Sequence, residues 1–159
     1  MMKITVIALA SLKEKYLKDA AAEYIKRLRT YCDLKVIELD SIRLSEKASL
    51  AEISSALERE AELIAKKIPA GDFVIPLCIE GKQLSSEEFS GVLEQEMNIG
   101  RGVTFIIGSS CGLADNIKRR GDLKLSFSKM TFPHMLLRVI LLEQIYRAFK
   151  INGGESYHK

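Results

Sequence analysis

The chain has 159 residues, of which 47% are hydrophobic and 28% are charged, a composition typical of folded globular proteins rather than disordered ones. We expect one domain over residues 1–159, because this length can bury a sizeable core. The sequence contains neither a signal-peptide pattern nor an apolar run near the roughly 18–20 residues of a membrane helix, and the net charge of +3 alone excludes little.

Apolar spacing predicts strands and helices that alternate along the chain. Short runs rich in β-branched residues predict strands, and apolar residues three and four positions apart predict helices. In chain order we predict a strand at 4–9, a helix at 14–31, a strand at 34–39, a helix from 49, a strand at 73–79, a helix from 85, a strand at 103–107, a short helix at 115–119, a strand at 124–127 and a helix at 134–149. Two capping boxes, Ser49 with Glu52 and Ser85 with Glu88, mark two of the helix starts. This alternation is typical of an α/β fold with a mostly parallel sheet and flanking helices.

Two of these elements have unusual sequences. Pro76 cannot donate a hydrogen bond to a neighbouring strand, so we expect Leu77 and Cys78 to lie at the end or edge of their strand. The helix at 134–149 is apolar around almost its whole circumference, which predicts burial on all sides. In a chain this small, such a helix indicates a subunit interface.

Three loops qualify as ligand-binding loops. Parallel sheets bind ligands beyond the carboxyl ends of their strands, and the segments 76–80, 108–112 and 126–132 each follow a predicted strand. The third loop is polar, carries the cation Lys129, and is followed by Pro133, which favours the start of the last helix. We therefore expect the three loops to form a single site.

Positive charge is concentrated near the third loop. Residues 117–159 contain nine Lys and Arg against three acidic residues, a net charge of +6, which leaves −3 for residues 1–116. Such an excess favours an anionic partner. A solvated basic surface without a partner is the alternative interpretation.

The segment Gly108-Ser-Ser-Cys-Gly112 fits the G-x-S-x-G pattern of serine hydrolases, with Ser110 as the nucleophile. The other members of a triad would come from Asp115, Asp122, His134 and His158. Against this, the chain is short for such a fold and no HGGG-type oxyanion motif precedes the pattern. The same glycines could instead serve a tight turn, or allow the backbone to approach a nucleoside ligand.

Neither a metal site nor a disulfide framework is indicated. Cys32, Cys78 and Cys111 are odd in number and have no C-x-x-C spacing, which suits a reducing cytoplasm. The chain has only two histidines and no H-E-x-x-H pattern, so a histidine-based metal site has little support. Its glycines match neither a P-loop nor a dinucleotide-binding fingerprint.

The chain closely resembles the RlmH family along its whole length. The family consists of SPOUT-type methyltransferases that modify N3 of a pseudouridine in large-subunit (23S) ribosomal RNA. The resemblance rests on Leu-Ser-Phe-Ser-Lys-Met-Thr-Phe-Pro-His at 125–134, Arg-Val-x-Leu-x-Glu-Gln-x-Tyr-Arg-Ala at 138–148, Tyr-His-Lys at 157–159, Leu-Lys-Glu-Lys-Tyr at 12–16, Glu-Gly-Lys-x-Leu-Ser-Ser-Glu at 80–87 and Phe-Ile-Ile-Gly at 105–108.

The resemblance implies S-adenosylmethionine as the methyl donor. It also implies a homodimer with the last helix at the interface, and a trefoil knot in the C-terminal third. The cofactor-binding residues that it implies are Leu77, Gly108, Phe127, Ser128, Lys129, Met130, Thr131 and Phe132. The chain departs from the family at Gly108-Ser-Ser-Cys-Gly112, where Gly-Gly-Ser-Asn-Gly is usual, and at Ala10-Ser11, where Gly-Lys is common. The first departure affects the cofactor loop.

The chemistry of this reaction selects a set of polar residues. The imide N3 carries a proton at neutral pH, so a base, or a cation that stabilises the N3 anion, should assist methylation. We expect Arg147, Tyr157 and His158 to hold and deprotonate the target base, with His134 near the cofactor loop and a flexible tail that becomes ordered on the ribosomal substrate. An RNA-binding module without catalysis is the alternative, since the changes in the 108–112 loop could have removed cofactor binding.

Overall fold

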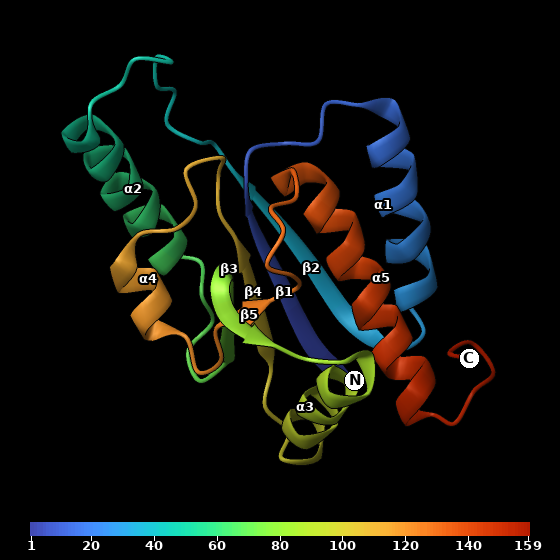
Figure 1. The fold of residues 1–159 in the computed structure, drawn as a ribbon. Coiled ribbons are helices and arrows are strands. Elements are labelled where there is room, and N and C mark those ends of the chain that lie inside the picture. Colours follow the sequence, from blue (N-terminus) through green and yellow to red (C-terminus); the bar gives the residue numbers. More distant parts are fainter.

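The computed structural model describes residues 1–159 and contains a five-stranded parallel sheet with helices on both faces (Figure 1). The strand order across the sheet is β2-β1-β4-β3-β5. Along the chain the elements are β1 (Met2–Leu9), α1 (Lys15–Leu28), β2 (Cys32–Leu39), α2 (Leu50–Ala65), β3 (Phe73–Gln83), α3 (Ser86–Asn98), β4 (Val103–Ile107), α4 (Asp115–Arg120), β5 (Leu125–Ser126) and α5 (His134–Asn152). The predicted α/β class with a mostly parallel sheet is confirmed.

The sheet separates two hydrophobic cores. Strand β1 shows the division, because successive side chains point to opposite faces: Val6 and Ala8 belong to the larger core, and Ile7 and Leu9 to the smaller one. Helices α1, α3 and α5 contribute to the larger core, whereas α2 and α4 contribute to the smaller one. Figure 1 shows α2 and α4 together on one side of the sheet, and α1 with α5 on the other.

Both predicted capping boxes are present. The Ser49 hydroxyl accepts a hydrogen bond from the Glu52 amide at the start of α2, and the Glu52 side chain accepts from the Ser49 amide in return. Ser85 and Glu88 make the same reciprocal pair at the start of α3. These local sequence signals therefore predicted the start of each helix correctly.

Leu77 and Cys78 do not lie at the end of their strand, but from Leu77 on the strand has a partner on one side only. Strand β3 continues through the proline to Gln83. Pro76 is the last β3 residue paired with β4, opposite Ile106, and Leu77 is the first paired with β5, opposite Leu125. The missing N–H therefore lies where β3 changes its partner strand, so the proline is tolerated inside the strand.

Helix α5 lies between α1 and α3 and packs against both. Its inner face is fully buried and includes Leu141, Leu142 and Ile145. Its outer face is only partly covered, and Leu136 retains 40% of its exposure. The expected burial on all sides thus holds for the inner face of the helix alone. None of the helices combines the length and apolar character that a membrane span requires.

Candidate functional site

The three candidate segments surround one cavity of about 660 Å³ beyond the carboxyl ends of β4 and β5, at the start of α5. The prediction that the first segment, 76–80, is a loop is wrong, because it lies within β3. Of the predicted cofactor-binding residues, the structure brings together seven around this cavity, namely Leu77, Gly108, Phe127, Ser128, Met130, Thr131 and Phe132. Lys129 is exposed and does not line it. A volume in this range is typical of sites for nucleoside-sized ligands.

The 108–112 loop is a tight turn that depends on its glycines. Gly112 has a φ of +84°, a left-handed conformation that glycine adopts without strain. A side chain on Gly108 would collide with the carbonyl oxygen of Gly112. The turn is closed by a hydrogen bond from the Gly112 amide to the Ser109 carbonyl, at 2.9 Å. The bare backbone of this turn therefore forms one wall of the cavity.

Hydroxyl groups shape the loop after β5. The buried Ser126 hydroxyl donates to the Ser128 carbonyl at 2.9 Å. The Ser128 hydroxyl accepts from the Met130 amide at 3.0 Å. Both side chains are thus used to fix the backbone of the loop, as in other local side-chain to backbone turns.

His134 is the first residue of α5 and lines the cavity. Burial lowers the pKa of its imidazole, and the nearby Arg138 guanidinium lowers this pKa further. The imidazole is therefore neutral near pH 7 and can accept a proton or a hydrogen bond.

Arg138 fixes the start of α5 against the sheet. Its guanidinium is 3% exposed, pairs with the Glu38 carboxylate, and donates to the Ala10 carbonyl at 2.6 Å. Glu38 lies near the carboxyl end of β2, and Ala10 directly follows β1. This contact sets the position of His134, one helical turn earlier.

A second polar cluster lies around the last turns of α5. The Arg147 guanidinium donates two hydrogen bonds to Glu143 Oε1, at 2.9 and 2.6 Å, and lies 3.1 Å from His158 Nδ1. The Tyr157 hydroxyl donates to the same Glu143 oxygen at 3.2 Å. His158 Nε2 lies 2.6 Å from a carboxylate oxygen of Glu87 at the start of α3. Three of the predicted catalytic residues therefore form one network, although the tail that carries two of them was expected to be flexible.

Protonation within this cluster is set by burial and by its acidic partners. Burial first, and then the Glu143 carboxylate, raise the pKa of Tyr157 to about 12. The hydrogen bond to Glu143 raises the pKa of Arg147. Tyr157 and Arg147 are therefore hydrogen-bond donors at physiological pH, and neither can serve as a base.

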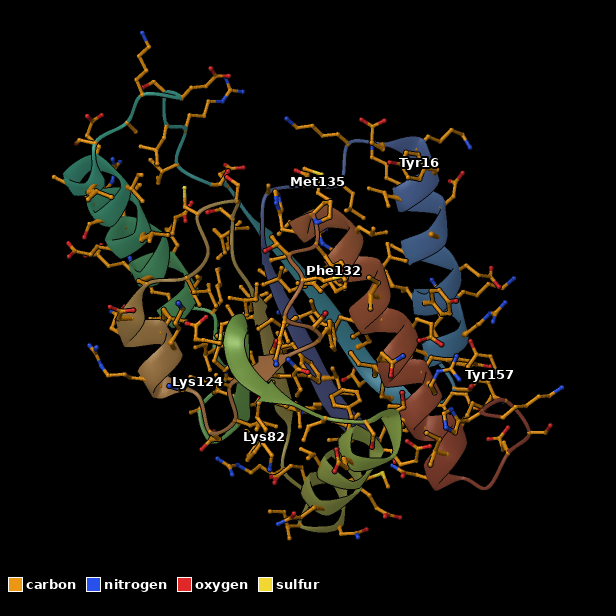
Figure 2. All side chains as sticks on the ribbon, in the orientation of Figure 1. Tyr16, Lys82, Lys124, Phe132, Met135 and Tyr157 are labelled. Atoms are coloured by element: carbon orange, nitrogen blue, oxygen red, sulfur yellow. The ribbon has the colours of Figure 1, made fainter.

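The two groups of predicted site residues are not close to each other in one chain. His134 and Arg147 stand thirteen positions apart on α5, which corresponds to about 20 Å at the rise of an α-helix. Figure 2 shows the same separation, with Phe132 and Met135 near one end of α5 and Tyr157 near the other. In one chain, the cavity with His134 and the Arg147 cluster are therefore two separate sites.

The structure gives no support to a serine hydrolase. Ser110 and His134 both line the cavity, but no hydrogen bond joins them. Asp122 accepts a hydrogen bond from the Val74 amide at the start of β3, and His158 belongs to the distant cluster. The Ser-His-Asp geometry that this chemistry needs is therefore absent. No group of His, Cys, Asp and Glu side chains is arranged to hold a metal ion.

Sequence reasoning missed Glu60, a buried carboxylate beside the site. Glu60 is 3% exposed and lines a second cavity of about 120 Å³, which shares Ser109 and His134 with the main one. Its position in the sequence could have revealed it, because Glu60 stands four residues after Ala56 and four before Ile64, on the apolar stripe of α2. A charged residue in such a stripe requires a partner or a function.

Known proteins match the chain over its whole length. The family model described as "Predicted SPOUT methyltransferase" matches residues 2–158. The chain is 50% identical over 159 residues to "Ribosomal RNA large subunit methyltransferase H" of Carboxydothermus hydrogenoformans, an alignment that covers 99% of this chain and 100% of that protein. The protein of the same name from Clostridium acetobutylicum gives the same identity and coverage.

Solved structures share the fold at low sequence identity. A probable methyltransferase from Bordetella pertussis superposes with a TM-score of 0.60 at 11% identity, covering 93% of this chain and 95% of that one. A probable methylase family protein from Haemophilus influenzae gives a TM-score of 0.52 at 14% identity, covering 99% and 70%.

Proposed function

Because the chain belongs to the SPOUT methyltransferases and, among them, to the family of the large-subunit ribosomal RNA methyltransferases H (RlmH), we propose that it methylates N3 of a pseudouridine in 23S ribosomal RNA with S-adenosylmethionine as the donor. The observation that carries this proposal is the 50% identity over the full length of such a methyltransferase. In this proposal residues 1–159 act as one methyltransferase domain in the cytoplasm, on ribosomal RNA or the large subunit.

The main cavity has the properties that the methyl donor needs. Its volume of about 660 Å³ suits a nucleoside with an amino-acid extension. The bare backbone at Gly108 allows close approach, since a side chain there would fill the turn. Leu77 and the residues 127–128 and 130–132 would hold the cofactor on the other side, with Phe127 and Phe132 giving apolar contact. S-adenosylmethionine supplies a methyl group already activated on a sulfonium centre, so alignment is the main task left to the protein.

The polar residues of the chain would handle the target base. Arg147 and Tyr157 would donate hydrogen bonds to the base and stabilise negative charge that develops when N3 loses its proton. His158 Nδ1 accepts from Arg147 in this structure, so His158 would have to give up that contact in order to take the N3 proton, and His134 stands neutral at the cofactor cavity. Loss of the N3 proton would make the imide nitrogen a stronger nucleophile. Transfer of the methyl group to N3 would break the sulfur–methyl bond of the donor, with S-adenosylhomocysteine as the leaving group.

A homodimer would unite the two groups of residues. In a two-fold dimer the same surface of each subunit meets its copy. If the outer faces of two α5 helices cross antiparallel, the Arg147 end of one helix lies near the His134 end of the other. The partly exposed apolar residues Met135, Leu136 and Val139 on α5 favour this contact. The complete site would then contain the cavity of one subunit and the tail of its partner.

An exposed basic surface beside the cavity would bind the RNA backbone. Its cations have no ion pair in the structure and are Lys82, Arg119, Arg120, Lys124 and Lys129. The Lys82 amide donates to the Lys124 carbonyl at 2.8 Å, so these two residues are held side by side (Figure 2). Phosphate contacts of this kind predict RNA binding that weakens as salt concentration rises.

Calorimetry with S-adenosylmethionine tests the cofactor site, with two glycine variants as a matched pair. Gly108→Ala should abolish binding, because the added carbon collides with the turn. Gly91→Ala should leave binding unchanged, because an added carbon there meets nothing within 4 Å. A folded wild-type protein that shows no binding would favour the alternative of an RNA-binding module without catalysis.

A further inference from the structure

Glu60 is a buried acid that the proposed mechanism does not use. Its side chain points from α2 into the small cavity of about 120 Å³, between the segment 41–44 and the 109–111 part of the glycine turn. No Lys, Arg or His lies within ion-pair distance of it, in contrast to Glu96, which is 3.7 Å from Arg101. A buried carboxylate without a cation depends on hydrogen bonds for its stability.

Two hydrogen bonds connect Glu60 to separate loops. Its Oε2 accepts from the Ile42 amide at 2.9 Å, in the long connection between β2 and α2. Its Oε1 accepts from the Ser109 hydroxyl at 3.1 Å, in the glycine turn that lines the main cavity. Ser110 and Cys111, the other residues of this turn with polar side chains, make no side-chain hydrogen bond. Ser109 is therefore the one side chain that fastens the turn to α2.

Glu60 itself lies outside the main cavity, although its partner Ser109 lines both cavities. Movement of the turn would change the wall at Gly108, where the space for a ligand is set by bare backbone. The hydrogen bond between Glu60 and Ser109 thus affects the shape of the main cavity, although Glu60 does not line that cavity. Side chains that hold a binding loop in this way commonly set its affinity without touching the ligand.

We propose that Glu60 is a positioning residue that holds the 108–112 turn through Ser109, and so sets the affinity of the main cavity for the methyl donor. This inference rests on the proposed function, because it assumes that S-adenosylmethionine binds in the main cavity. In this proposal Glu60 acts through its hydrogen bonds and not through its negative charge. Glutamine at position 60 can keep both bonds, since its amide oxygen accepts from the Ile42 amide and its NH₂ group donates to the Ser109 hydroxyl.

The experiment is calorimetry with S-adenosylmethionine on the full-length protein and a set of variants. Glu60→Ala should weaken binding about tenfold, and Glu60→Gln should stay within about threefold of the wild type. Ser109→Ala should weaken binding, and adding it to Glu60→Ala should change nothing further, because the two residues act through one hydrogen bond. Glu58→Gln, an exposed acid on the same helix, is the matched control and should bind as the wild type does.

Several outcomes would overturn the proposal. Unchanged affinity in Ser109→Ala would show that the turn does not need this bond, and this variant decides the matter even if Glu60→Ala fails to fold. Equal losses in Glu60→Gln and Glu60→Ala would mean that the negative charge acts on the ligand. If the wild type does not bind S-adenosylmethionine at all, it is the proposed function that fails. Amide exchange at Ile42 provides an independent readout, since loss of its acceptor in Glu60→Ala should speed its exchange and Glu60→Gln should restore protection.

Discussion

Ala10 is the only residue other than glycine with a positive φ, at +79°. The left-handed region is strained for alanine because its Cβ approaches the backbone, whereas glycine adopts it freely. The position is held by hydrogen bonds from the Ala10 amide to the Leu39 carbonyl and from Arg138 to the Ala10 carbonyl. The alanine of this chain therefore carries a conformational cost that glycine would not carry at the same φ.

We predict that Ala10→Gly raises the free energy of unfolding by up to about 1 kcal/mol, because relief of strain exceeds the added freedom of the unfolded chain. Urea denaturation measures this change. Ala51→Gly on the exposed side of α2 is the control, and should lower the same free energy by about 1 kcal/mol. A decrease at position 10 would show that the turn is not strained.

Tyr157 is expected to act as a hydrogen-bond donor. Its pKa is raised to about 12, by burial first and then by Glu143, so the neutral phenol persists through the ordinary pH range. We predict that Tyr157→Phe lowers the rate of methylation about tenfold, while the ring keeps its packing 5.0 Å from Tyr146. The pH–rate profile should keep its shape up to pH about 10. A rise in wild-type activity toward high pH that the variant lacks would identify Tyr157 as a base.

We expect the tail after α5 to carry a function separate from that of the main cavity. Deleting residues 157–159 removes Tyr157 and His158 but none of the residues that line the main cavity. We therefore predict that the truncated protein binds S-adenosylmethionine as the full chain does, and does not methylate RNA. Calorimetry and methyl-transfer assays measure the two properties. Loss of both would indicate that the tail serves folding instead.

Elements whose boundaries are set by local interactions were predictable from sequence. Ser49 and Ser85 mark the starts of α2 and α3, because a capping box involves residues only three positions apart. Pro76 misled the prediction for β3, since its tolerance depends on which neighbouring strand pairs on either side of it. That information is non-local and does not appear in the run of residues around the proline.

The candidate site was predictable in part for the same reason. The convergence of the loops 108–112 and 126–132 follows from a parallel sheet, whose strands end at one edge, whereas the segment 76–80 contributes to the cavity from within β3. By contrast, the roles proposed for Arg147, Tyr157 and His158 came from the chemistry of the reaction that the resemblance implies, and the structure places Arg147 about 20 Å along α5 from His134. Glu60 was missed because its partners Ile42 and Ser109 are distant in sequence.

At the scale of the whole molecule, the proposed site is complete only when a second subunit is present. Leu136, 40% exposed on the outer face of α5, would lie in the proposed dimer interface. We predict that Leu136→Asp gives a monomer in sedimentation experiments and loses methylation, because a buried charge without a partner opposes association. Leu50→Asp is the control: Leu50 is 86% exposed at the start of α2, and this variant should remain dimeric and active.

A Leu136→Asp protein that stays dimeric would place the interface elsewhere, and a monomeric wild type that methylates RNA would remove the need for one. The trefoil knot that the resemblance implies for the C-terminal third stays a prediction.

The central claim is that this protein methylates a pseudouridine at N3 in large-subunit ribosomal RNA. The most direct measurement is mass mapping of ribosomal RNA from cells with and without the gene. We predict that one pseudouridine-containing fragment of 23S RNA from the deletion strain lacks the mass of a single methyl group, and that purified protein with S-adenosylmethionine restores it at N3. Identical maps from the two strains, or a restored methyl group on another atom or another RNA, would contradict the account.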